Sequence, residues 1–262
     1  MSLLAENTKR WNSVKVKPSF MAASRKFASL AMVHKAEYED IAHEIMVRYG
    51  YHIPWWFIPL VHERECRKGV DNWNCNIAQG VNYNLHSHLK PYNGPFPSFK
   101  EAAIDALVIE APQAARNENW SGGGSMSIAE RYNGLGYARM GRSSPYVWSG
   151  TDKYIRGKYI ADGKYDPDEV DNQVGIAVAL KALMELDPTI QLDGDHPGQG
   201  KVNRKAEGTV VTGASGGLLA SINALIPYYD LTWWDIGGFI FGAVIISGLI
   251  IYFINKHKKG QI

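Results

Sequence analysis

Cysteine is scarce in this sequence, which has only Cys66 and Cys75 among its 262 residues. Two sulfur atoms are too few for a structural zinc site built on cysteine. The two residues are nine positions apart, which is close enough for a disulfide. Such a bond would restrain the chain beside Glu65 and would indicate a fold that works outside a reducing compartment. Two separate thiols are the other interpretation, and the spacing does not decide between them.

An excess of charge of one sign is also missing. The 28 basic and 26 acidic residues leave a formal net charge of +2, so nothing in the total indicates nucleic-acid binding and we expect no nucleic-acid partner. By contrast, 45% of the residues are hydrophobic and 11% are aromatic, which is ample for a packed core. A disordered protein is therefore excluded.

Several signatures of targeting and catalysis do not occur. Residues 1–35 hold basic side chains but no long apolar stretch, so we expect an N-terminal extension without a cleavable signal peptide. Neither the HExxH spacing of zinc peptidases nor a nucleophile elbow is found. His62, His86 and His88 could be combined with Glu65 into a zinc site only without that spacing, and we expect no metal and no organic cofactor.

One long hydrophobic run is present near the C-terminus. Residues 236–254 carry no charge over 19 positions, which at the rise of a helix spans roughly the 30 Å of a bilayer core. We expect a transmembrane helix over residues 233–256, with the lipid bilayer as a partner. Aromatic residues flank it and a basic tail, residues 257–262, follows, which by the positive-inside rule lies in the cytoplasm. A buried helix of a globular protein is the alternative.

A second uncharged stretch leaves the topology open. Residues 208–229 are long enough to cross a bilayer but are rich in Gly, Ser and Thr. As a flexible tether they would be part of a linker over residues 191–232, and a single span would place the main domain outside the cytoplasm. As a second span they would form a hairpin, and the domain would lie on the same side as the basic tail.

Helical periodicity dominates residues 36–190, and alternation of strand length is almost absent. We therefore predict an all-α domain with structured loops. The expected helices cover residues 37–49 with Gly50 as C-cap, residues 54–68, a segment capped by Ser98 that runs to 111, a segment capped by Ser127 that runs to 140, and residues 166–186. Residues 141–166 read as ordered but irregular structure.

Two glutamates lie near the end of the second expected helix. Glu65 follows Ile58 and Val61 by seven and four positions, so it extends an apolar stripe towards the interior. A carboxyl held against apolar walls has a raised pKa and can donate a proton near neutral pH. Glu63 is the competing candidate because Trp56 and Pro59 precede it at the same offsets. Periodicity alone leaves both open.

Aromatic side chains crowd the second half of the domain. Tyr132, Asn133 and Tyr137 fall on one expected helix, and Tyr146 and Trp148 fall in the loop-rich stretch that follows. Such side chains can stack on sugar rings in a carbohydrate cleft, and they can equally fill a core. We take these five as candidate substrate-binding residues.

Four segments together resemble a family of phage and prophage lysozyme-like peptidoglycan hydrolases. They are the HxRE element at residues 62–65, the AAIDAL segment at 102–107, ERYNGLGY at 130–137 and the long motif SPYVWSGTDKYIRGKYIADGKYDPDEVDNQ at 144–173. The resemblance covers roughly residues 37–185. The element formed by Tyr132, Asn133 and Gly134 is also similar to the tyrosine-asparagine motif of goose-type lysozymes and lytic transglycosylases.

The resemblance implies a lysozyme-like domain whose catalytic acid is Glu65. It would cleave the β-1,4 bond between N-acetylmuramic acid and N-acetylglucosamine in peptidoglycan, by hydrolysis or by lytic transglycosylation. Asp71 or Asp105 could supply a second carboxylate. In goose-type lysozymes and lytic transglycosylases, the tyrosine that matches Tyr132 lies near the catalytic carboxyl.

The chain departs from the family pattern at two places. Cys66 stands where a small hydroxyl residue usually follows the glutamate, and the loop at residues 84–94 matches only loosely, which affects the expected substrate contacts. The membrane helix would hold the domain facing peptidoglycan, at the host inner membrane for lysis or in a virion membrane for wall penetration. A noncatalytic glycan-binding or virion structural protein with the same fold is the alternative. Glu65 beside Tyr132 in a polar cleft would favour the enzyme, and Glu65 in a closed salt bridge would favour the binding protein.

Overall fold

The computed structural model describes residues 2–66, 68–78, 81–86, 94–161 and 163–194. The expected membrane helix and basic tail, and most of the expected linker, lie outside these ranges. Within them, no helix combines the length and the hydropathy needed to cross a membrane.

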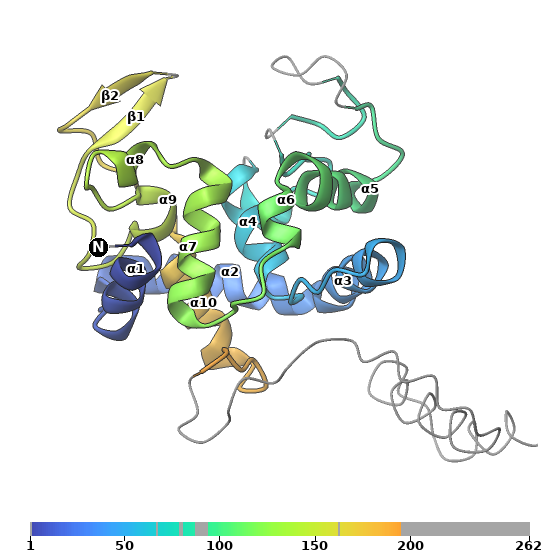
Figure 1. The fold of residues 1–262 in the computed structure, drawn as a ribbon, viewed down its shortest axis with the longest axis horizontal. Coiled ribbons are helices and arrows are strands. Elements are labelled where there is room, and N and C mark those ends of the chain that lie inside the picture. Colours follow the sequence, from blue (N-terminus) through green and yellow to red (C-terminus); the bar gives the residue numbers. More distant parts are fainter. Residues whose placement is uncertain (1, 67, 79–80, 87–93, 162, 195–262) are drawn as a thin grey trace, which may run out of the picture. The chain divides into compact units, whose positions relative to one another are not determined.

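The described chain is mostly helical, which confirms the predicted α class. The principal helices are α1 (Leu3–Asn12), α2 (Met21–Val33), α3 (Lys35–Tyr49), α4 (Phe57–Glu65), α5 (Phe99–Ile104), α7 (Gly122–Asn133) and α10 (Ile176–Leu186). Shorter helical pieces are η1 (Pro18–Phe20), η2 (Gly69–Asp71), the π-helical turn η3 (Asp105–Glu110), α6 (Pro112–Ala115), α8 (Gly136–Arg139) and α9 (Pro145–Trp148). A two-stranded antiparallel hairpin, β1 (Lys158–Ala161) and β2 (Lys164–Asp166), projects from the helical body (Figure 1).

Two of the predicted helix ends are confirmed in detail. Helix α3 ends at Gly50, whose φ of 72° lies in the left-handed region that glycine adopts without strain. Helix α5 begins after Ser98, whose hydroxyl accepts a hydrogen bond from the backbone N–H of Glu101. Local capping chemistry therefore specifies these boundaries.

Three other helix boundaries differ from the prediction. Helix α4 covers only Phe57–Glu65 of the expected 54–68. Helix α7 begins after Ser121, not Ser127, and Ser127 lies buried inside the helix with its hydroxyl bonded to the carbonyl of Gly123. Helix α10 begins at Ile176 rather than near residue 166. The acidic Asp166–Asp168 segment instead forms a turn in which Asp166 accepts the backbone N–H of Asp168 at 2.9 Å.

The N-terminal segment is part of the compact unit and not an appendage. Helix α1 packs against α7, and α2 packs against α10 (Figure 1). The first contact is close because Gly122 has no side chain: a Cβ there would lie 2.0 Å from the indole nitrogen of Trp11. Buried Asn7 also donates to the Glu130 carboxylate at 3.1 Å. Residues 3–33 thus belong to the fold that the sequence placed in residues 36–190.

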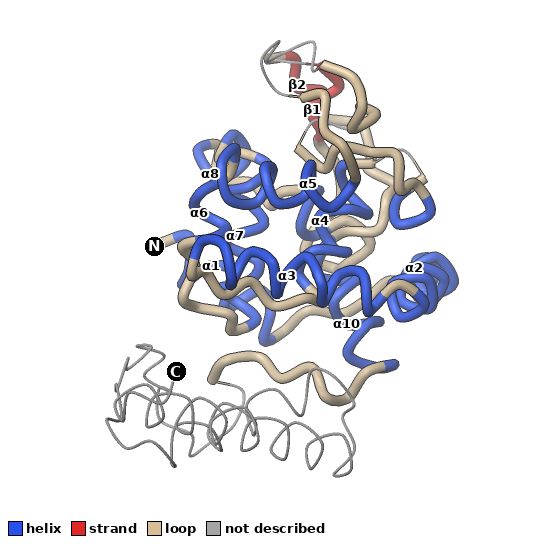
Figure 2. Tube along the Cα trace, turned by 90° about the vertical axis from the view of Figure 1, so that its right-hand side faces the viewer, coloured by secondary structure: helices blue, strands red, loops and turns tan. Residues whose placement is uncertain are grey.

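Helix α4 is enclosed by its neighbours along most of its length. Every residue from Phe57 to His62 is buried, and Glu65 is the last residue of the helix. The side view shows the helices gathered into one body with the hairpin at one end (Figure 2). The helix therefore places the Glu65 carboxyl near the base of the hairpin.

Candidate active site

A cavity of about 620 Å³ lies between the end of α4 and the hairpin. Helix α4 contributes Arg64 and Glu65 to its wall. The rest of the lining comes from the α7–α8 turn, α9, the hairpin and the segment before α10, as Asn133, Gly134, Gly136, Tyr137, Pro145, Tyr146, Lys158, Tyr159, Ile160, Ala161, Gly163, Asp171 and Gln173. Segments that lie far apart in the sequence thus meet around Glu65.

The Glu65 carboxyl is half-buried in this wall. Burial disfavours its charged form and raises its pKa from the ordinary 4.5 to about 7. The Tyr146 hydroxyl and the positive charge of Arg64 partly oppose the rise. The group therefore exchanges its proton near neutral pH, as expected from the apolar stripe that precedes it.

Two phenols accompany Glu65. The Tyr132 hydroxyl donates to the backbone carbonyl of Ile77 at 2.7 Å, which fixes the Tyr132 ring beside the loop that contains Ile77. The Tyr146 hydroxyl is buried beside Glu65. It meets the distance and angle criteria of a hydrogen bond with none of the described residues. Burial, with the nearby Glu65 charge, raises the pKa of both phenols well above the ordinary value, so both stay protonated.

The guanidinium of Arg64 is held in an ion pair with a residue other than Glu65. Its guanidinium lies 2.8 Å from the Asp171 carboxylate, and the two side chains are only 5% and 2% exposed. It also lies over the Tyr146 ring, 5.1 Å from the centroid. Among the described residues Glu65 has no ion-pair partner within salt-bridge distance, which keeps its carboxyl open to the cavity.

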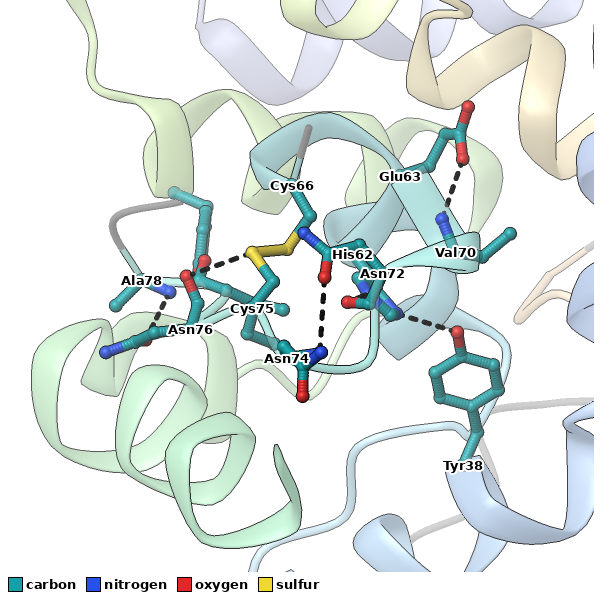
Figure 3. Close-up of a disulfide and its surroundings, with 12 residues drawn as sticks. Tyr38, His62, Glu63, Cys66, Val70, Asn72, Asn74, Cys75, Asn76 and Ala78 are labelled. Atoms are coloured by element: carbon teal, nitrogen blue, oxygen red, sulfur yellow. Dashed lines mark hydrogen bonds between the residues drawn. A yellow bond between two sulfur atoms is a disulfide. The ribbon is translucent and has the colours of Figure 1, made fainter. Parts of the chain in front are cut away.

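The other candidate carboxylates lie elsewhere. Glu63 accepts the backbone N–H of Val70 at 3.2 Å and does not line the cavity (Figure 3). Asp71 pairs with Lys26 at 3.4 Å, and Asp105 begins the π-helical turn; neither is among the lining residues that the structure describes. Geometry therefore separates Glu65 from Glu63, which periodicity could not do.

Three of the five candidate substrate-binding residues line the cavity, and two do not. Asn133, Tyr137 and Tyr146 line the cavity, and the Tyr137 hydroxyl accepts the backbone N–H of Tyr159 at 2.9 Å. Tyr132 lies beside Glu65 but is not a lining residue. Trp148 is fully buried in the core, where no sugar can reach it, so the prediction that Trp148 binds substrate is wrong.

Sequence reasoning missed three charged residues of the wall. They are Arg64, Lys158 and Asp171. All three fall inside segments quoted for the family resemblance, Arg64 in the HxRE element and the others in the long motif at residues 144–173. A search for charged positions within those motifs would have found them.

His62 belongs to the core and not to a metal site. Its Nδ1 bonds to the Tyr38 hydroxyl at 2.8 Å and its Nε2 to the carbonyl of Asn72 at 2.9 Å (Figure 3). Burial lowers its pKa to about 4, so the ring is neutral, donating through Nε2 and accepting through Nδ1. Of the described residues, no three metal-binding side chains form a cluster, and His88 lies outside the described ranges.

A disulfide joins Cys66 to Cys75 directly after the Glu65 position (Figure 3). Cys66 is the C-cap of α4, and Cys75 lies two residues before Ile77, whose carbonyl holds Tyr132. The bond therefore ties the end of the Glu65 helix to the loop that positions Tyr132.

Replacing both cysteines with serine should lower the free energy of unfolding by about 2–3 kcal/mol, because the disulfide removes loop-closure entropy from the unfolded chain. Urea denaturation with and without a reductant measures this. The reductant should shift the midpoint of the wild type and leave the double variant unchanged. A wild-type midpoint that is insensitive to reduction would contradict the structural role of the bond.

Compared with protein-family models, curated proteins and solved structures, this chain matches none of them.

Proposed function

We propose that this chain is a peptidoglycan-degrading muramidase that cleaves the β-1,4 bond between N-acetylmuramic acid and N-acetylglucosamine. The observation that carries the proposal is the Glu65 carboxyl, which opens into the cavity with a pKa of about 7. Glycosidic oxygens are poor leaving groups unless they are protonated as the bond breaks. Glu65 is therefore assigned as the general acid.

In this mechanism the protonated Glu65 donates its proton to the bridging oxygen. The bond between that oxygen and C1 of the N-acetylmuramic acid residue breaks, and the oxygen leaves as a hydroxyl group of N-acetylglucosamine. Positive charge develops on the muramic acid ring. Water then attacks in a hydrolase, or the sugar's own hydroxyl attacks in a lytic transglycosylase, and the attacking group returns a proton to Glu65. Either route restores the starting protonation state.

The cavity suits a carbohydrate in size and lining. About 620 Å³ falls within the range of pockets that enclose small ligands. The amides of Asn133 and Gln173 can exchange hydrogen bonds with hydroxyl and acetamido groups. Tyr137 and Tyr159 pack edge to face with ring centroids 5.2 Å apart and supply an aromatic wall.

The noncatalytic alternative is less well supported. It would be favoured if Glu65 were closed in a salt bridge, whereas the nearby cation, Arg64, is paired with Asp171 instead. A phage would use the activity for host lysis or wall penetration, with residues 236–254 anchoring the domain in a membrane so that it faces peptidoglycan.

The two candidates are distinguished by incubating the purified full-length chain with sacculi. An enzyme releases soluble fragments and lowers turbidity, while a binding protein sediments with intact sacculi and releases nothing. We expect soluble fragments. Cosedimentation without any release would favour the noncatalytic protein.

The rate of cleavage should depend on pH through Glu65. The acid must be protonated, so the rate should fall as the pH rises through about 7 and then decrease about tenfold for each further unit. The folded-state pKa is raised above the ordinary 4.5, so the stability linked to this group is present at low pH and lost as the pH rises through about 7.

A pH–rate profile measured together with thermal unfolding separates the two effects. An alkaline limb centred near an ordinary carboxyl pKa, or no limb at all, would contradict the assignment of Glu65. In the Glu65→Gln variant the corresponding decline in stability should disappear.

A further inference from the structure

Lys158 lies in the cavity wall but has no assigned role. It is the first residue of β1, opposite Asp166 in the hairpin ladder, and its side chain is 33% exposed. The exposed part contributes to the cavity lining. A cation held at the edge of a binding cavity suggests contact with a ligand.

The charge of Lys158 is not needed to balance Asp171. The Asp171 carboxylate already has the Arg64 guanidinium at 2.8 Å and accepts the backbone N–H of Gln173 at 2.9 Å. Lys158 Nζ lies 3.9 Å away, at the limit of an ion pair. With Glu65 protonated, the described charges of the wall are Arg64, Lys158 and Asp171, which leave a surplus of one positive charge.

Lys158 enters the cavity from a different element than the catalytic acid. It begins β1, whereas Glu65 ends α4, and the carboxylate that its Nζ approaches, at 3.9 Å, is that of Asp171 and not that of Glu65. Lys158 is therefore placed to contact a part of the substrate that does not take part in proton transfer. This position is typical of a residue that selects the substrate.

We propose that Lys158 binds a carboxylate carried by the muramic acid residue of the substrate, an inference that rests on the proposed function. The sugar hydroxyls and acetamido groups of peptidoglycan are neutral. Its carboxylates belong to the stem peptide or, where the peptide is missing, to the free lactyl arm. An ammonium group in a partly enclosed cavity forms a charge-assisted hydrogen bond with either.

Matched substrates test the proposal. They are glycan strands with stem peptides, strands freed of peptide by an amidase, and samples of each whose carboxylates are converted to neutral methylamides. Each strand and its own methylamide differ chiefly in charge. Lys158→Met removes the ammonium group and Lys158→Arg keeps a positive charge. Lys164→Met is the control, since Lys164 is exposed on β2 of the same hairpin and does not line the cavity.

The wild type should prefer charged strands over their methylamides by about tenfold in kcat/KM, the size expected for one charge-assisted contact. Lys158→Met should lose this preference, while Lys158→Arg and Lys164→Met should keep it. The source of the carboxylate follows from whether peptide-bearing or peptide-free strands show the larger preference. An unchanged preference in Lys158→Met would overturn the proposal, as would a wild type without preference.

Binding of the strands is measured in parallel on the Glu65→Gln chain, with and without Lys158→Met. This readout does not require cleavage. If the wild type cleaves no substrate but binding still depends on charge through Lys158, the muramidase proposal fails and the carboxylate site stands. If cleavage occurs but neither cleavage nor binding depends on Lys158, the carboxylate site fails and the muramidase proposal stands.

Discussion

Replacing Glu65 with glutamine should lower kcat for cleavage of sacculi by about 10²- to 10⁴-fold, the usual contribution of general acid catalysis. Glutamine has nearly the same shape but no ionisable proton. The fold should be retained, because the change removes a half-buried carboxyl that resists ionisation. Initial rates of fragment release, with circular dichroism as a check on folding, measure the effect.

Glu63→Gln is the matched control for this experiment. Glu63 lies two residues earlier on the same helix, is also half-buried with a pKa raised by burial, and bonds to the backbone of Val70 outside the cavity. Its replacement should leave kcat within a few-fold of wild type. Equal losses in the two variants would show that the helix end, and not the Glu65 proton, is what the reaction requires.

Replacing Arg64 with methionine should lower the free energy of unfolding by about 3–5 kcal/mol, the cost of leaving one member of a buried ion pair without its partner. Among the described cations, Asp171 would keep the distant Lys158 at 3.9 Å as its partner. The loss of the cation over the Tyr146 ring adds to the effect. Urea denaturation measures the change.

An exposed ion pair of the same chemistry provides the comparison. Arg156 and Asp168 also lie 2.8 Å apart, but their side chains are 63% and 76% exposed. Arg156→Met should cost less than about 1 kcal/mol because solvent screens the pair. Adding Asp171→Asn to Arg64→Met should recover part of the stability. Similar costs for the two arginines would contradict the buried role of Arg64.

Local chemistry made part of this structure predictable from the sequence. The ends of α3 and α5 follow from a glycine that adopts positive φ and a serine that caps a free N–H, and both effects act within a few residues. The apolar stripe before Glu65 likewise predicted a carboxyl with a raised pKa. In each case the information lies on a single helix.

The wrong predictions have two causes, a competing local cap or turn in some places and contacts between distant segments in others. Ser127 has the pattern of a cap, but Ser121 caps α7 instead, since its hydroxyl accepts the N–H of Gly124, and the glycines at this end let α1 pack closely against the helix. Trp148 stands in a loop-rich segment, yet the core encloses its indole completely. The pairing of Arg64 with Asp171 joins residues more than a hundred positions apart, which no local pattern indicates.

The most direct test of the central assignment is mass spectrometry of the fragments released from sacculi by the wild type and by Glu65→Gln. We expect the wild type to leave stem peptides intact and to create new muramic acid ends, as reducing or 1,6-anhydro sugars, and the variant to create almost none. Fragments cut within the peptide or at its amide link to the sugar, or the same glycan ends from both proteins, would contradict this assignment.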